Sequence, residues 1–381
     1  MGIDIPDNVS LLYSASYGIQ RLVWVFDQAQ KFDAIQGYGK SMTRECEVEN
    51  LELCPAGLCL SRGHAVGAWT TGPTEAPGFD WMVPWWNADC SGGGCVSALV
   101  QVESEGGWSS WYPVEQWGAI PRSFSRKSDG TLCVETDTAL LPRRSERFRL
   151  RIVLSKMPLE AGTLADGKMD AEDDFSRVGG AVLHRCGILT RDRNAPRPQT
   201  RRLYLRESLT EVPPLSQMDE AEAVRGRICS PTCVTMALRA LGRIYPTAFV
   251  AADCYDFGEK IYGNWAFNVA SLWRLGAQAR LDFFPTAEQA GSELFFGKIL
   301  IASIRFQDGS LGGAPIQKTN GHLVLLKGVR RRDDGSWGIV VNDPAAGDVE
   351  GVPRVYDIDE FERAWSGLAY VVEGPRPVAG R

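Results

Sequence analysis

Short apolar runs separated by turn residues fill the chain between about residues 60 and 190. At the start of the run Phe148–Leu154, apolar and charged residues alternate, which is the pattern of a half-buried strand. Turn residues such as Asp129-Gly130 separate the runs, as they do in all-β domains. We therefore predict an antiparallel β-sandwich or jelly roll, with strands at Cys95–Val102, Phe148–Leu154 and Gly179–His184.

The pattern changes after Arg191–Pro198, a polar, proline-containing stretch with the composition of a linker. Beyond it we predict a short strand at Arg202–Arg206 and then a mixture of helices and strands. The expected helices are Pro231–Leu241 and Ala266–Leu275, and the expected strands are Ile299–Phe306, His322–Val329 and Trp337–Asn342. Asp334-Gly335 predicts a hairpin between the last two strands. The sequence thus indicates an α+β protein with two domains, residues 1–195 and 196–381.

Composition and charge narrow the range of functions. With 44% hydrophobic and 23% charged residues, the chain can bury a core of ordinary size. A formal net charge of -6 argues against a nucleic-acid partner. No apolar stretch reaches the roughly 18 residues that a membrane helix needs, so we expect no membrane partner. The N-terminus lacks the pattern of a signal peptide, so we expect a cytoplasmic protein, or a secreted one if the true start differs.

The ten cysteines show no CxxC spacing, so neither a zinc knuckle nor a thioredoxin motif is indicated, and we expect no metal or cofactor. Reduced, semi-buried thiols are the favoured interpretation. The alternative is a bridge between Cys90 and Cys95, which flank a Ser-Gly-Gly-Gly loop. Six tryptophans gather in the predicted sandwich: Trp81, Trp85, Trp86, Trp108, Trp111 and Trp117. Core packing is their favoured role, and a sugar-stacking or peptide-binding surface is the alternative.

Cys229 lies at the start of a predicted helix. Ser230 suits the cap position and Pro231 suits the first helical position, where a missing N–H costs nothing. Apolar residues then recur on one helical face at Val234, Ala237, Leu238 and Leu241. Free amides and the helix dipole favour the thiolate, which makes Cys229 a candidate nucleophile. The plain alternative is a small apolar residue at a helix start.

A cysteine nucleophile needs a base, which is usually histidine. The chain has only three histidines, and only His322 shares the C-terminal domain with Cys229. Asp343 ends the strand that pairs with the strand of His322, because Pro344 cannot continue the ladder, and its carboxylate would orient the imidazole. Gln217, twelve positions before the cysteine, would donate to an oxyanion. Taken singly, each of these residues also has a structural interpretation: a rim or core histidine, a turn aspartate and a surface glutamine.

The order Gln, Cys, His, Asp resembles the papain-like cysteine peptidases that process double-glycine bacteriocin leaders. The motifs are Ser216-Gln217, Cys229-Ser230-Pro231-Thr232, Gly321-His322-Leu323 and Asn342-Asp343-Pro344. Two further stretches, Gly263–Asn268 and Val355-Tyr356 with Phe361–Trp365, resemble a bacterial branch of that family. The resemblance covers residues 212–373 and implies that Cys229 is the nucleophile, His322 the base, Asp343 the orienting residue and Gln217 the oxyanion donor. The N-terminal half is loosely similar to β-sandwich modules that precede such peptidases.

Four features differ from the pattern or add to it. Ser230 stands where many relatives have glycine, and its Cβ is expected to lie near the cleft. The insert Asp219–Arg225 separates Gln217 from Cys229. We also expect no attached transporter segment, and hence no role in export-coupled leader cleavage. Cys233 follows Cys229 by one helical turn; burial is its favoured role and that of a resolving thiol the alternative.

We therefore expect a cysteine peptidase that hydrolyses a peptide or isopeptide bond through a thioacyl-enzyme at Cys229, with a peptide or protein substrate. Two alternatives remain. The same triad would serve an acyltransferase or amidase, or the protein would bind a glycan or cell-wall peptide through its N-terminal domain and carry a weak or inactive peptidase domain.

Overall fold

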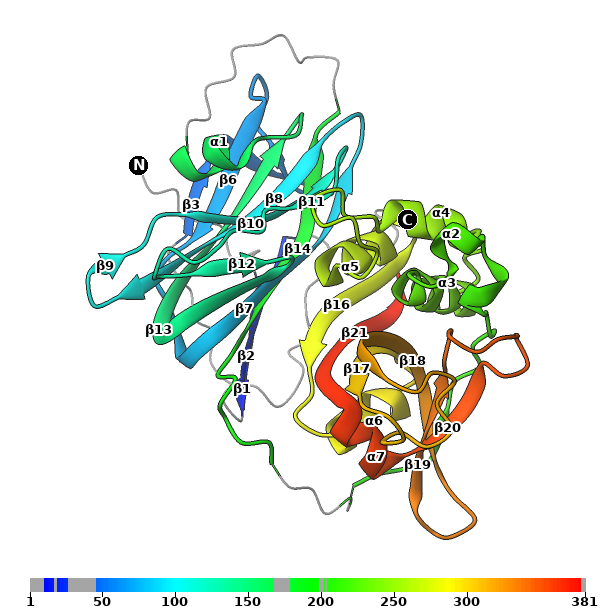
Figure 1. The fold of residues 1–381 in the computed structure, drawn as a ribbon. Helices are drawn as coiled ribbons and strands as arrows, with labels where there is room; N and C mark the ends of the chain where they lie inside the picture. Colours follow the sequence, from blue (N-terminus) through cyan, green and yellow to red (C-terminus); the bar gives the residue numbers. More distant parts are fainter. Residues whose placement is uncertain are drawn as a thin grey trace. The chain divides into compact units, whose positions relative to one another are not determined.

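The computed structural model describes residues 10–16, 19–26, 46–167, 179–198, 202 and 204–377. The chain divides into two compact units, which Figure 1 colours along the sequence. The first comprises residues up to Ala195 together with the loop Asp256–Lys260, and the second comprises Pro196–Tyr255 and Ile261–Pro377. Antiparallel sheets in both units and helices mainly in the second confirm the predicted α+β class.

The first unit is built on one branched antiparallel sheet. Its strands are β1 (Ser10–Ser16), β2 (Ile19–Val25), β3 (Cys46–Glu49), β4 (Leu51–Cys54), β5 (Gly57–Leu60), β6 (Val66–Thr71), β7 (Thr74–Cys90), β8 (Cys95–Ser104), β9 (Gly107–Trp108), β10 (Tyr112–Gly118), β11 (Arg122–Ser123), β12 (Cys133–Glu135), β13 (Thr138–Ser155) and β14 (Ala181–Arg191). Strands β7 and β13 are long enough to change partners along their length: β7 pairs first with β13 and then with β14. This exchange of partners makes the sheet branch.

Three of the six clustered tryptophans, Trp85, Trp86 and Trp117, are fully buried in the first unit. Gly187 pairs with Trp85 across β14 and β7, and a Cβ at Gly187 would meet the Trp85 ring at 2.5 Å, so only glycine fits under this indole. Trp108 is half-buried and carries the guanidinium of Arg149 at 4.6 Å from its ring centroid. These contacts support the packing role of the tryptophans.

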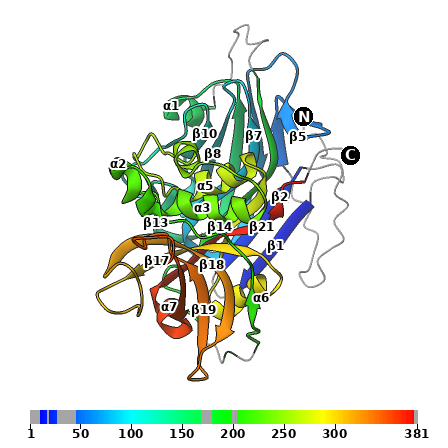
Figure 2. The same ribbon diagram turned by 90° about the vertical axis from the view of Figure 1, so that its right-hand side faces the viewer.

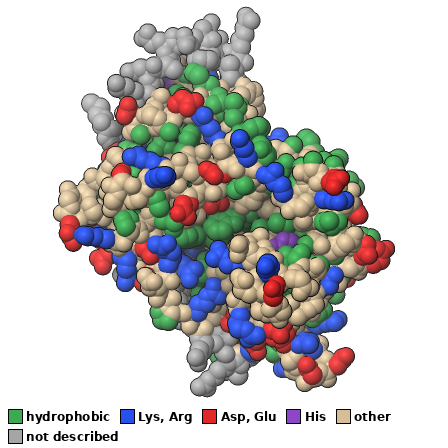
Figure 3. All heavy atoms as spheres, in the orientation of Figure 1, with side chains coloured by type: hydrophobic (Ala, Val, Ile, Leu, Met, Phe, Trp, Pro, Cys, Tyr) green, Lys and Arg blue, Asp and Glu red, His purple; other side chains and the backbone are tan. Residues whose placement is uncertain are grey.

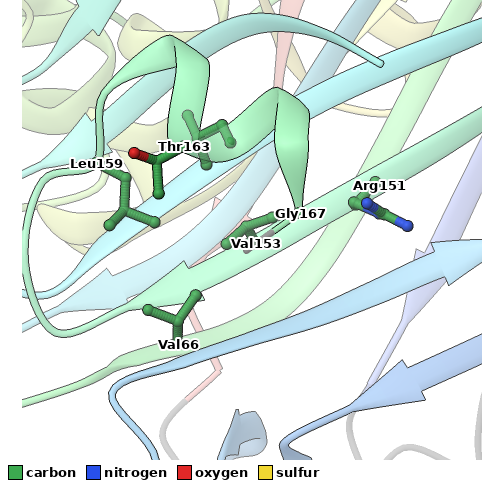
Figure 4. A pocket seen from close by; sticks show the side chains of 7 residues that line it. Val66, Arg151, Val153, Leu159, Thr163 and Gly167 are labelled. Carbon is green, nitrogen blue, oxygen red and sulfur yellow. The ribbon is translucent and has the colours of Figure 1, made fainter. Parts of the chain in front are cut away.

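One small pocket lies where the helix α1 (Ala161–Asp166) meets β13 (Figure 4). Apolar side chains line most of it, including Val66, Val153 and Leu159, and Arg151 lies at its rim. Its volume of about 10 Å³ is close to the space of a single water molecule, so it offers no room for a ligand. The thiols of Cys90 and Cys95 each contact a backbone carbonyl oxygen, of Trp117 and Gly93 respectively.

The second unit has an antiparallel sheet in the order β16-β21-β17-β18-β19-β20, with β15 added to β18. The strands are β15 (Ser208–Leu209), β16 (Ala277–Phe283), β17 (Ile299–Phe306), β18 (Thr319–Arg331), β19 (Trp337–Asn342), β20 (Pro353–Asp357) and β21 (Trp365–Pro375). The helices are α2 (Glu222–Arg225), α3 (Cys229–Ala240), α4 (Thr247–Asp253), α5 (Trp265–Arg274), α6 (Ala287–Phe295) and α7 (Ile358–Ala364). Alternate residues of β17 and β18, such as Leu300 and Val324, share a core with α6 and α7. Helices α3 and α5 lie against the sheet as well (Figure 2).

The structure contains the three strands predicted to start at Ile299, His322 and Trp337 and the two helices predicted to start at Pro231 and Ala266. Strands β18 and β19 form the predicted hairpin, and Gly335 in its turn has a φ of 79°. The strand predicted at Arg202–Arg206 is wrong for the described residues of that stretch, because pairing begins only at Ser208. Side chains hold the stretch instead: the Arg202 guanidinium forms ion pairs with Asp359 and Glu362, both at 2.6 Å. A segment fixed by its own side chains does not require a ladder of backbone hydrogen bonds.

Helix α3 differs from its prediction in two ways. It begins at Cys229, and Ser230 is not its cap, because the capping position belongs to Ile228, which has no capping side chain. Pro231 therefore occupies the third helical position, where its missing N–H still costs no bond, because the first intrahelical bond of this type runs from Thr232 to Ile228. The helix is also buried on all sides from Ser230 to Leu238 rather than on one face.

No helix in the described part of the chain is long and apolar enough to cross a membrane. On the face shown in Figure 3, acidic and basic side chains are both dispersed among polar and apolar ones.

Candidate active site

Cys229 is the first residue of α3, and its side chain is only half-buried. The backbone N–H groups of Ser230 and Leu323 donate hydrogen bonds to its sulfur. The first comes from the free end of the helix, and the second comes from β18, on which His322 also lies. A sulfur that receives N–H donors at a helix N-terminus is favoured as the thiolate.

His322 is 4% exposed and lies between the cysteine and a carboxylate. Its Nε2 is 2.8 Å from Oδ1 of Asp343. Nδ1 is therefore the ring atom left for the hydrogen bond that His322 makes with Cys229. His322 lies on β18, and Asp343 directly follows β19, the hairpin partner of β18. Leu325 is opposite Asn342, and this pairing brings the two side chains together.

The Asp343 carboxylate is completely buried, and donors surround both of its oxygens. Oδ1 accepts from His322 and from the backbone N–H of Ala345 at 3.0 Å. Oδ2 accepts from the hydroxyl of Tyr356 at 2.7 Å. The backbone N–H of Asp343 donates to Val352 at 2.8 Å, so the main chain is fixed as well.

The electrostatic interactions among Cys229, His322 and Asp343 favour the charged form of each side chain. Burial opposes ionisation of the Cys229 thiol, but His322 and the two N–H donors outweigh burial, so the pKa of Cys229 is lowered. Burial also disfavours the imidazolium, yet Asp343 and Cys229 raise the pKa of His322 to about 10. The pKa of Asp343 is lowered in spite of burial, chiefly by the charge and hydrogen bond of His322 and then by Tyr356. The three shifts therefore all favour the charged forms, a thiolate at Cys229, an imidazolium at His322 and a carboxylate at Asp343.

Gln217 begins a short 3₁₀ turn and lies beside the Asp343 loop, where its backbone N–H donates to Pro344 at 2.9 Å. The preceding hydroxyl, of Ser216, donates to the carbonyl oxygen of Ala346 at 2.5 Å. Gln217 is 6% exposed, and its side-chain carbonyl oxygen has no hydrogen-bond partner among the described residues. The structure thus brings Gln217 to the loop that carries Asp343, while no hydrogen bond joins its amide to Cys229 among the described contacts.

Ser230 does not crowd the cleft, because it is 1% exposed and faces the interior. Its hydroxyl donates to Oδ1 of Asn268 at 2.8 Å and lies 3.0 Å from the hydroxyl of Tyr370. The Asn268 amide donates in turn to the carbonyl oxygens of Tyr262 and Asn264. This network ties the first turn of α3 to α5 and to β21.

Cys233 is fully buried, and its S–H donates to the carbonyl oxygen of Leu323 at 3.5 Å. Burial, with smaller contributions from Cys229 and Asp343, raises its pKa well above the ordinary value. The N–H of the same residue, Leu323, donates to Cys229. Cys233 therefore remains a thiol that contacts the backbone of Leu323, which favours the burial interpretation over that of a resolving thiol.

Sequence reasoning gave no role to Tyr356, Asn268 or the Leu323 amide. Tyr356 and Asn268 both fall in stretches that resemble the peptidase family, and this was the one signal that pointed to them. Their partners lie far away along the chain, so the contacts depend on the fold. No group of three or more His, Cys, Asp or Glu side chains among the described residues is arranged to hold a metal ion.

Two family models match the chain. Residues 209–372 match the peptidase C39-like family, and residues 30–165 match the peptidase C39 N-terminal domain. No curated protein matches the chain.

Three solved structures are similar to part of the chain. A double-glycine-motif protease from an AMS/PCAT transporter, solved with its leader peptide, is 21% identical over 45% of this chain and 95% of its own, with a TM-score of 0.32. A protein described as a C39-like peptidase from Bacillus anthracis is 14% identical over 44% and 97%, with a TM-score of 0.33. The peptidase domain of Streptococcus ComA is 14% identical over 43% and 98%, with a TM-score of 0.29.

Proposed function

Because residues 209–372 match the model of the peptidase C39-like family, we propose that this protein is an active cysteine peptidase with Cys229 as its nucleophile. The observation that carries the proposal is the continuous hydrogen-bonded chain from Cys229 through His322 to Asp343. A buried imidazole between a half-exposed thiol and a fully satisfied carboxylate is the arrangement that nucleophilic catalysis needs.

In the first half of the reaction, the Cys229 thiolate attacks the carbonyl carbon of the scissile bond. The imidazolium of His322 then gives its proton to the leaving amine, and a thioester to Cys229 remains. We assign the oxyanion to the backbone N–H of Cys229 and to the Gln217 amide, which lies in the turn next to the Asp343 loop. In the second half, neutral His322 takes a proton from water, the hydroxide attacks the thioester, and the carboxylic acid leaves as the thiolate returns.

The substrate is a peptide or a protein, as the family implies. Transfer of the acyl group to an amine instead of water would use the same residues, and no feature of the described site selects for it. The glycan-binding alternative lacks support, because three of the clustered tryptophans are buried and Trp108 and Trp111 are stacked against arginines.

The test uses the full chain and a library of peptides that carry a thiol-reactive fluoromethyl ketone. We expect the warhead to modify Cys229, and we expect a matched peptide amide to be cleaved. Cys229→Ala should lower cleavage by at least about 10³-fold, because it removes the nucleophile. Cys254→Ala is the matched control, since it makes the same substitution at a buried cysteine outside the site.

Modification of a different cysteine, or cleavage by Cys229→Ala at the wild-type rate, would contradict the proposal. Adding a primary amine to the cleavage reaction separates hydrolysis from acyl transfer, because transfer gives an amide product with the mass of the added amine.

A further inference from the structure

Tyr356 has no role in the peptidase chemistry described above, yet it makes one of the best-formed contacts of the site. Its side chain is completely buried in β20, and its hydroxyl donates to Oδ2 of Asp343 at 2.7 Å. Ile339 of β19 pairs with Tyr356, so the ring stands on the strand next to the one that ends before Asp343. The ring belongs to the core that the sheet shares with α7, and this packing fixes its direction.

The two carboxylate oxygens of Asp343 have different tasks. Oδ1 holds His322 and also receives the N–H of Ala345. The hydrogen bond that the structure describes for Oδ2 is the one from Tyr356. A buried carboxylate that loses a donor either turns toward another one or takes up a proton, and both changes would weaken its hold on His322.

We propose that Tyr356 is a positioning residue, which keeps the Asp343 carboxylate ionised and aimed at His322 through the hydrogen bond to Oδ2. This role rests on the proposed peptidase function, in which His322 serves Cys229. Tyr356 itself stays a donor, because burial and the charge of Asp343 raise its pKa far above the usual range of a phenol. The site is then a chain of four side chains, Cys229, His322, Asp343 and Tyr356.

The test is the pH dependence of Cys229 alkylation by iodoacetamide in the full chain, which needs no peptide substrate. In Tyr356→Phe, the Asp343 carboxylate loses a hydrogen-bond donor and should stabilise the His322 imidazolium less. The imidazolium should in turn stabilise the Cys229 thiolate less. The acid limb of the profile should move to higher pH by about one unit, and the limb set by His322 should move to lower pH. A purely structural role would change the thermal stability and leave both limbs in place.

Tyr112→Phe is the matched control. Tyr112 is 2% exposed and donates to Oδ2 of Asp129 at 2.7 Å, so the same change removes the same kind of bond in the first unit. Its profile should coincide with that of the wild type. If Tyr356→Phe does not fold, 3-fluorotyrosine at position 356 is the second variant, since it keeps the hydroxyl and strengthens it as a donor. It should move the acid limb to lower pH.

A folded Tyr356→Phe protein, or a fluorotyrosine protein, with the wild-type profile would overturn the proposal. A shifted profile in a protein that cleaves no peptide would support the positioning role, and in that case only the proposed function would fail.

Discussion

Cys229 differs from six other cysteines in the direction of its pKa shift. Burial raises the thiol pKa of Cys59, Cys95, Cys133, Cys186, Cys233 and Cys254. At Cys229 the same burial is outweighed by His322 and by two backbone N–H donors, and the pKa is lowered. Because only the thiolate is alkylated, reactivity should separate Cys229 from these thiols.

We predict that iodoacetamide modifies Cys229 first at pH 6–7, at least about tenfold faster than Cys233 or Cys254. The sign follows from the lowered pKa: the Cys229 thiolate persists to lower pH than an ordinary thiolate and is lost as the pH falls through the lowered value. Peptide mapping by mass spectrometry after brief labelling measures the order. His322→Ala should remove the advantage, and preferential modification of Cys233 in the folded wild-type protein would contradict the prediction.

The residues of the site were not equally predictable. Cys229 was found from a local signal, the start of an apolar helix, and His322 by elimination among three histidines. Tyr356 could not be found in that way, because its partner Asp343 is reached only through the pairing of β19 with β20. Local patterns indicate which residues can react, while tertiary contacts decide what supports them.

At the scale of elements, the burial of helix α3 could not be predicted from its hydrophobic pattern. The predicted face of α3 assumed a helix on a surface, but residues 230–238 are all buried. A helix that is buried on all sides must satisfy its polar side chains internally. Thr235 does so within its own helix, by donating to the carbonyl oxygen of Pro231 at 2.8 Å, whereas Ser230 donates to Asn268 of α5.

This difference predicts unequal effects of removing the two hydroxyls. Ser230→Ala should lower the free energy of unfolding by about 1–3 kcal/mol, because it leaves the buried Oδ1 of Asn268 without its donor. Thr235→Val is the control and should cost less, about 1 kcal/mol, because its hydroxyl bonds only a carbonyl of its own helix. Urea denaturation of the two variants provides the comparison.

Ser230→Ala should also slow Cys229 alkylation, since the network fixes the turn that carries the cysteine. Equal losses of stability in the two variants would show that the link from α3 to α5 does not hold the helix.

At the scale of the whole molecule, the change in hydrophobic pattern near Arg191–Pro198 predicted two domains, the first rich in strands and the second with helices and strands. A local pattern could not show that the loop Asp256–Lys260 joins the first unit. Asp256 is completely buried there and accepts from the backbone N–H and the hydroxyl of Ser123, at 3.0 and 2.7 Å. A loop of five residues is too short to show a hydrophobic period, so its place in the first unit could not be predicted from the sequence pattern.

Since Cys229, His322, Asp343 and Tyr356 all lie in the second unit, we predict that a fragment of residues 196–377 folds and keeps the reactivity of Cys229. The first residue of the fragment matters because two arginines anchor this stretch to the second unit. Arg197 donates to the carbonyl oxygens of Glu362 and Ser366, and Arg202 forms ion pairs with Asp359 and Glu362 of α7. A fragment of residues 208–377 is the matched comparison. It lacks these anchors and should melt several degrees lower, by about 2–8 °C.

Circular dichroism and iodoacetamide labelling of both fragments measure the outcome. The loop Asp256–Lys260 would lose its place in the first unit in either fragment, so both carry that change equally. The triad does not depend on the anchoring arginines, and Cys229 should therefore be alkylated at similar rates in the two folded fragments. If the fragment of residues 196–377 is folded and Cys229 is unreactive, the first unit must contribute to the chemistry of the site, and the assignment of the complete site to the second unit is wrong.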